Sequence, residues 1–189
     1  MTKPVEPAEL LRVVAGLVRY MDRQATAGDR ATALGRADAF LKFEKVLGAQ
    51  GVREALRFLN SRTPHRFTGL YRFDAAWRRS LHLVDSYAPD VRRGEDAPGD
   101  ESYCAIVGRE GRAFVTDDAR LDERLHAHPA REAVASYCGV LLRAEGGEPF
   151  GTLCHFDAVP CAVPVAEVPF MEAAAPYLLR ALAPSRADA

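Results

Sequence analysis

The chain contains little lysine and no excess of charge of either sign. Its 189 residues hold 25 lysines and arginines against 26 acidic residues, and lysine occurs only at Lys3, Lys42 and Lys45. A chain with balanced charge creates no net field that would favour nucleic acid or an anionic membrane. We therefore expect neither nucleic acid nor a membrane as a partner.

Long apolar runs are also missing. The most apolar N-terminal stretch, residues 10–20, is interrupted by Arg12, Gly16 and Arg19, and is too short to span a bilayer or to form the core of a signal peptide. The hydrophobic content of 48% is nevertheless enough to bury a core. We expect a cytoplasmic protein with one domain and helical extensions.

The spacing of the cysteines excludes the common cysteine sites. Cys104, Cys138, Cys154 and Cys161 include no C-x-x-C pair and lack the paired spacing of a structural zinc site. In a reducing cytosol they are expected to be free thiols. The sequence also lacks G-x-S-x-G, P-loop and H-E-x-x-H motifs. We therefore assign no metal ligand and no catalytic residue, and predict that the chain is not an enzyme.

The first third of the chain has a helical pattern. Apolar residues recur every three or four positions over residues 7–21, 34–47 and 52–59. Gly28 interrupts the pattern between the first two segments, and Gly51 separates the second from the third. The sequence predicts three helices here.

After Pro64 the apolar period changes to two, which is typical of strands. The segment DAAWRRS, residues 74–80, predicts a turn that joins the first two strands as an antiparallel hairpin. The last two strands are joined by a glycine-containing turn, and an apolar helix follows over residues 165–182. The predicted strands are residues 66–74, 80–88, 112–119, 136–142 and 151–157. The expected fold class is α+β.

Two short helical segments are predicted between the strands. Asp100 is a good N-cap for a helix from Glu101 to Val107, with Gly108 as its stop. This would place Cys104 in the first helical turn, where the helix dipole lowers a thiol pKa. Residues 122–132 also have helical character, interrupted at HAHP.

The order of these motifs resembles a GAF domain, a family of small-molecule sensing modules related in fold to PAS domains. The resemblance covers about residues 66–160 and is carried by ESYC, FVTDDARLDERLHAHP, SYCGVLL and PFGTLCHFD. It implies a twisted antiparallel sheet with a pocket on one face, roofed by short helices and loops. It also implies flanking N- and C-terminal helices on the opposite face, which commonly mediate dimers.

The resemblance divides the chain into an N-terminal helical extension (1–62), a GAF domain (63–162), and a C-terminal helix and tail (163–189). It implies a stand-alone sensory module that binds a small molecule and signals through dimeric helices to a partner protein. Neither the ligand nor a cofactor is named by the fold. The alternatives are a cysteine-based redox sensor and an enzyme resembling the methionine sulfoxide reductases built on this fold.

The same resemblance places the ligand over one sheet face, under the loop of residues 91–100. Tyr103 and Phe114 would supply aromatic wall, and Arg124 or His126 an orienting polar group. In the alternative interpretation the aromatic residues belong to the core and the charges are solvated. The predicted ligand-binding residues are Tyr103, Cys104, Val107, Phe114, Asp117, Asp118, Arg124, His126 and Cys138.

Two further interpretations stay open in the sequence. Cys138 and Cys154 have the pattern of small core residues, whereas a redox sensor would use Cys104 together with a strand cysteine. The apolar helices over residues 7–21 and 165–182 have more apolar surface than one sheet face needs, which predicts a homodimer. The alternative is that both helices cap the core of a monomer.

Overall fold

The computed structural model describes residues 27–183, with side chains from residue 34 onward. The helix predicted over residues 7–21 lies outside this range. The chain divides into two units, residues 1–39 and 40–189, and the sheet and its covering elements belong to the second. In the described part of the chain, no helix combines the length and the apolar character needed to cross a bilayer.

The helices before the sheet are longer than the sequence suggested. Helix α2 spans Ala27–Gln50, so Gly28, interpreted as a break, lies within it. Gly51 ends α2 with φ of 82° and ψ of −176°, a conformation that only glycine adopts without strain. Helix α3, Val52–Asn60, follows at once and confirms the third predicted helix.

The sheet has six antiparallel strands in the order β3-β2-β1-β6-β5-β4. Both predicted hairpins are present, β1 with β2 and β5 with β6. The first turn is shorter than predicted, because β2 already begins at Trp77 and the connection is Ala75 and Ala76. The strands are β1 Phe67–Asp74, β2 Trp77–Asp85, β3 Ala97–Pro98, β4 Phe114–Thr116, β5 Ser136–Arg143 and β6 Pro149–Asp157.

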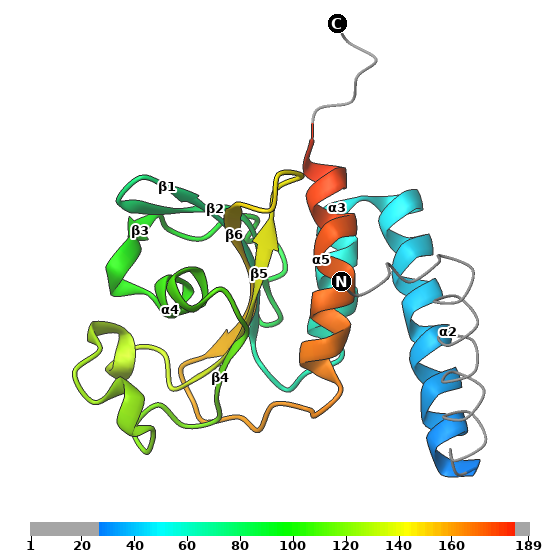
Figure 1. Ribbon diagram of the computed structural model, residues 1–189, viewed down its shortest axis with the longest axis horizontal. Coiled ribbons are helices and arrows are strands. Elements are labelled where there is room, and N and C mark those ends of the chain that lie inside the picture. Colours follow the sequence, from blue (N-terminus) through cyan, green and yellow to red (C-terminus); the bar gives the residue numbers. More distant parts are fainter. Residues whose placement is uncertain (1–26, 184–189) are drawn as a thin grey trace, which may run out of the picture. The chain divides into compact units, whose positions relative to one another are not determined.

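Helices cover both faces of this sheet (Figure 1). On one face lie α3 and α5, the latter spanning Glu167–Leu182, with Met171 and Leu178 fully buried against the strands. The other face carries helix α4, Tyr103–Glu110, and the loops that follow it. Two covered faces explain why both sides of β5 and β6 are apolar.

The elements around α4 differ in their boundaries from the sequence prediction. A 3-10 turn, η1, occupies Gly99–Glu101, and Ser102 rather than Asp100 stands at the N-cap position of α4. The helix continues through Gly108 and ends at Gly111, where φ is 66°. Gly108 has a packing role, because a Cβ atom there would lie 2.9 Å from the ring of Phe73.

The segment predicted to be helical and interrupted at HAHP contains two 3-10 turns. The first is η2, Glu123–Leu125, and the second is η3, Pro129–Glu132. The side chain of Asp122 accepts a hydrogen bond from the amide of Arg124 and caps η2. His128 caps η3 in the same way through its Nδ1 atom. Each turn therefore has a local polar cap.

A buried polar network ties α3 and α5 to the sheet. Thr68 Oγ1 lies 2.8 Å from His155 Nδ1 and accepts a hydrogen bond of 2.9 Å from Asn60 Nδ2. Glu167 is 1% exposed and accepts two bonds from Arg62 Nε, at 3.1 and 3.3 Å. The guanidinium compensates a carboxylate that would otherwise be costly to bury.

His65 makes folding stability depend on pH. Its side chain is 2% exposed, and burial, aided by the neighbouring His155, lowers its pKa to about 4. An unfolded histidine titrates near 6.5, so the unfolded chain binds this proton more tightly and the free energy of unfolding falls as pH falls through that window. We predict a loss of roughly 2 kcal/mol between pH 7 and pH 5 from this residue.

Urea unfolding of the wild type and of His65→Gln at both pH values would measure this contribution. The variant should lose less stability on acidification than the wild type does, whereas His126→Gln, at an exposed position, should behave like the wild type. Equal losses in wild type and His65→Gln would contradict the assignment.

Candidate functional site

A cavity of about 320 Å³ lies over the sheet face that carries α4. Its floor is formed by strand residues, one wall by the start of α4, and its roof by η3 and the residues after it. The lining residues are Tyr71, Arg78, Ala97, Glu101, Ser102, Tyr103, Cys104, Pro129, Ala130, Ala133, Val134, Tyr137, Cys154 and Phe156. Its size and mostly apolar lining are those of a small-molecule pocket.

The floor is built around a row of three paired residues. Gly69 of β1 and Gly139 of β5 flank Cys154 of β6 in the strand register. A Cβ atom on Gly69 would lie 2.4 Å from the Tyr71 ring, and one on Gly139 would overlap the Tyr137 hydroxyl. Because both glycines lack side chains, the two tyrosine rings fold down on either side of Cys154. The thiol therefore lies at the centre of the floor.

Arg78 brings a half-buried positive charge to the cavity. Its guanidinium carbon lies 4.1 Å from the centre of the Tyr71 ring, a cation–π contact. Its Nε atom is buried without a hydrogen-bond partner. Burial lowers the pKa of Arg78, but Cys104 and Tyr71 outweigh this effect and raise it. The site thus offers an unused donor on a cation, which favours an acceptor or an anion nearby.

Two thiols with different acidities line the cavity, Cys104 in the wall and Cys154 in the floor. A hydrogen bond from Cys154 lowers the pKa of Cys104 to about 6 against the effect of burial, and the charge of Arg78 adds to this. The Tyr137 hydroxyl donates a further bond to Cys104 Sγ at 3.5 Å. Burial instead raises the pKa of Cys154. Of the two thiols, Cys104 is therefore the one whose surroundings favour the thiolate.

Tyr103 joins the wall of the cavity to its roof. Its hydroxyl donates to the carbonyl oxygen of Val134 at 3.1 Å, and its ring lies 4.7 Å from the ring of His128. Burial raises the pKa of Tyr103 to about 12, so the hydroxyl stays protonated and remains a donor. This contact fixes η3 over the cavity.

Of the predicted ligand-binding residues, Tyr103 and Cys104 line this cavity. Val107 and Phe114 lie in the adjoining apolar core, buried to 0% and 3% exposure. Cys138 lies on the other face of the sheet, where its Sγ is 3.7 Å from Met171 Sδ of α5. Neighbouring residues of a strand point to opposite faces, and the sequence does not say which face carries the pocket.

The predicted polar residues stand outside the cavity in the loop before η3. Asp117 is exposed and accepts a hydrogen bond of 2.9 Å from the amide of Val163. Arg124 pairs with Asp122 and stacks on Phe114, with 4.5 Å between the guanidinium carbon and the ring centre. His126 is exposed. None of these side chains contributes to the cavity lining.

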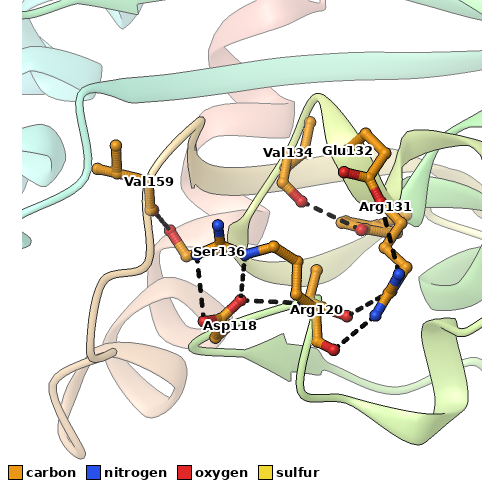
Figure 2. Close-up of polar contacts among 9 residues, drawn as sticks. Asp118, Arg120, Arg131, Glu132, Val134, Ser136 and Val159 are labelled. Atoms are coloured by element: carbon orange, nitrogen blue, oxygen red, sulfur yellow. Dashed lines mark hydrogen bonds and ion pairs between the residues drawn. The ribbon is translucent and has the colours of Figure 1, made fainter.

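The side chain of Arg131 holds the loop after β4 through hydrogen bonds to two backbone carbonyl groups (Figure 2). Arg131 Nε donates to the carbonyl oxygen of Ala119 at 3.2 Å, and its Nη2 donates to that of Arg120. Asp118 pairs with the side chain of Arg120 at 3.1 Å. These bonds connect the loop after β4 to η3 and so position the roof.

Sequence reasoning missed Tyr71, Arg78, Tyr137, Cys154 and Phe156 as members of the site. The alternation in the last strand did place Cys154 and Phe156 on one face. Arg78 was assigned to the turn of the first hairpin, and its place inside β2 emerges only from the strand pairing with Phe73 and Ala97.

Among the described residues, no three histidine, cysteine or acidic side chains converge in a way that could hold a metal ion. No protein-family model matches the sequence, and no curated protein matches it.

Solved structures do match the fold. The GAF domain of an Acinetobacter phosphoenolpyruvate-protein phosphotransferase superposes with a TM-score of 0.62 at 13% identity, covering 76% of this chain and 89% of that one. Free methionine-R-sulfoxide reductase from Neisseria meningitidis, solved with its substrate, gives 0.59 at 13% identity over 77% and 86%. The chromophore-binding domain of Stigmatella aurantiaca phytochrome P1 gives 0.60 at 14% identity over 79% and 60%.

The chain therefore has a GAF fold, and the α+β class predicted from the sequence is confirmed. The identities are low, so the likeness concerns the arrangement of the sheet and helices. The chemistry of the site has to be argued from its own residues.

The role of Arg131 can be tested by hydrogen exchange. We predict that Arg131→Ala speeds amide exchange in residues 118–126 by about tenfold or more, because loss of its bonds to two carbonyl groups makes local opening easier. Mass spectrometry of peptides after exchange would measure this. Arg109→Ala, at an exposed position on α4, serves as the control and should leave the segment unchanged. Unaltered exchange in Arg131→Ala would contradict the proposed role.

Proposed function

We propose that this chain is a cytoplasmic sensory module that binds a small molecule in the cavity beneath α4. The observation that carries the proposal is the cavity itself, about 320 Å³ in size, which is lined by the half-buried Arg78 with a buried Nε that has no hydrogen-bond partner. Pockets of this kind combine an apolar lining with few polar anchors. The wall and roof consist of a short helix and loops, which can move without breaking the sheet.

The lining indicates the chemical class of the ligand. Tyr71, Tyr137 and Phe156 present aromatic surface, which suits a flat or apolar body. Arg78 suits a carboxylate or another group with acceptor oxygens. Glu101 is exposed at the edge of the cavity and leaves room for a donor on the outer end of the ligand. We therefore propose a small aromatic or aliphatic carboxylate as the ligand class.

The comparisons support a binding role for the fold. One similar structure is a chromophore-binding domain, and another was solved in complex with its substrate. A chromophore and a substrate are thus each bound by a protein of this fold. For the present chain, Arg78 and the tyrosine-lined floor supply the specific argument.

We propose that the chain binds its ligand without converting it. An activity assay distinguishes this from the alternative that the chain is an enzyme. Two similar structures are free methionine-R-sulfoxide reductases, and the surroundings of Cys104 lower the pKa of its thiol. An enzyme of that type would reduce free methionine sulfoxide with a dithiol reductant and would lose this activity in Cys104→Ser. A binding module would show no turnover, either as the wild type or as the Cys104→Ser variant.

Signal output is proposed to pass through helices that pair with a second copy of the chain and contact a partner protein. Leu34 and Leu41 on α2 are 67% and 61% exposed. Seven residues apart, they lie on the same face of the helix. Helix α5 contributes less free surface, because Met171, Ala175 and Leu178 are buried within the chain. The exposed leucines of α2 are therefore the proposed dimer contact.

Filling the cavity should abolish ligand binding. A thermal-shift screen with a panel of small aromatic and aliphatic carboxylates should find compounds that raise Tm by roughly 5 to 10 °C at a hundredfold excess over Kd. Ala130→Phe places a ring in the cavity and should remove that shift. Ala144→Phe, also half-buried but outside this cavity, should retain it. A shift that persists in Ala130→Phe would place the binding site elsewhere.

Light scattering tests the proposed dimer. The wild type should show twice its chain mass of 20.7 kDa at high micromolar concentration. The double variant Leu34→Gln and Leu41→Gln should show the mass of one chain, because it removes the apolar contact. Val165→Gln changes a residue that is 97% exposed and should not alter the mass. A wild-type protein with the mass of one chain would refute the dimer.

A further inference from the structure

The two thiols at the cavity floor form a site that ligand binding alone does not explain. We propose that Cys104 and Cys154 are a dithiol–disulfide switch that is oxidised by hydroperoxides entering the cavity. The inference does not depend on which small molecule the module binds.

The geometry places the two thiols in the same cavity on separate elements. Cys104 comes from the first turn of α4 and Cys154 from β6. The Tyr137 hydroxyl, which donates to Cys104 Sγ at 3.5 Å, lies against Gly139, and Gly139 is the strand partner of Cys154. The two cysteines are 3% and 1% exposed, yet both line the cavity. A small peroxide can thus reach thiols that are shielded from bulky reagents. A bond between them would join α4 to the sheet.

The surroundings give the two thiols different roles. Cys104 receives a hydrogen bond from the Tyr137 hydroxyl and lies beside the charge of Arg78, which together favour its thiolate. Cys154 has its pKa raised by burial and keeps its proton. The nucleophile is therefore Cys104, and Cys154 is the thiol that reacts second.

The reaction balances with a hydroperoxide as the oxidant. The Cys104 thiolate attacks the outer peroxide oxygen, the O–O bond breaks, and the leaving alkoxide or hydroxide takes up a proton. Cys104 is then a sulfenic acid. The Cys154 sulfur attacks Cys104 Sγ, the S–O bond breaks, and water leaves with the Cys154 proton. Two electrons pass from the thiols to the peroxide, and an external dithiol reverses the change.

The remaining cysteines provide internal comparisons. Cys138 lies on the opposite sheet face against Met171, and burial raises its pKa to about 12. Cys161 is half-buried in the loop before α5, and its pKa is also raised by burial. For neither thiol does an arginine lower the pKa as Arg78 does for Cys104, so both should oxidise slowly.

The experiment uses the full chain, reduced and then treated with hydrogen peroxide at neutral pH. Alkylation under denaturing conditions followed by peptide mapping should find a Cys104–Cys154 disulfide, with Cys138 and Cys161 still alkylated. Oxidation of Cys104 should be about tenfold or more faster than that of Cys138. Dithiothreitol should restore alkylation of both linked cysteines.

Three variants separate the roles. Cys154→Ser should stop at the sulfenic acid, trapped on Cys104 by dimedone, and Cys104→Ser should leave Cys154 unmodified. Cys138→Ser is the matched control and should form the disulfide at the wild-type rate. If Cys104→Ser does not fold, the dimedone adduct in Cys154→Ser still tests the nucleophile. Absence of the Cys104–Cys154 link in the wild type, or equal oxidation of Cys104 and Cys138, would overturn the proposal.

Discussion

The row Gly69–Cys154–Gly139 across three paired strands is the constraint on which the cavity depends. Side chains at both glycine positions would collide with Tyr71 and Tyr137, whose rings occupy that space. The cavity floor is therefore aromatic at its sides and has a thiol at its centre. Helix α4 and η3 need only bridge this floor to enclose a pocket, and Tyr103 joins them through its bond to the Val134 carbonyl.

The charge of Arg78 then determines which ligand groups the cavity favours. Arg78 enters from β2 over the Tyr71 ring, and the groups that raise its pKa are cysteine and tyrosine side chains. Elsewhere in the described chain, buried charge is paired more fully, as in the bond between Arg62 and Glu167. A guanidinium with an unused donor beside an acidic thiol is costly to maintain for packing alone. This cost is the physical reason for proposing a ligand site on this face of the sheet.

Much of the fold could be predicted because its signals are local. The alternation of apolar residues identified both hairpins, and the glycine before Val52 correctly separated two helices. The errors arose where tertiary contacts override local preference. Gly108 was interpreted as a helix stop, but it lies inside α4, where a side chain would meet the Phe73 ring. The turn of the first hairpin was drawn too long, because pairing with β1 extends β2 back to Trp77.

The sequence by itself determined the α+β class, five of the six strands in their order and the presence of a thiol at the start of α4, since each depends on neighbouring residues. The two-residue strand β3, in a segment predicted to be a loop, was missed. Only the tertiary structure decided which face of each strand meets the cavity. As a result, Cys154 lines the cavity together with Cys104, whereas Cys138 packs against Met171 on the opposite face. The sequence pattern around the two strand cysteines is the same alternation of apolar residues. The alternation of side chains between the two faces of a strand is a local property. Which elements cover each face depends on helices that are distant in sequence.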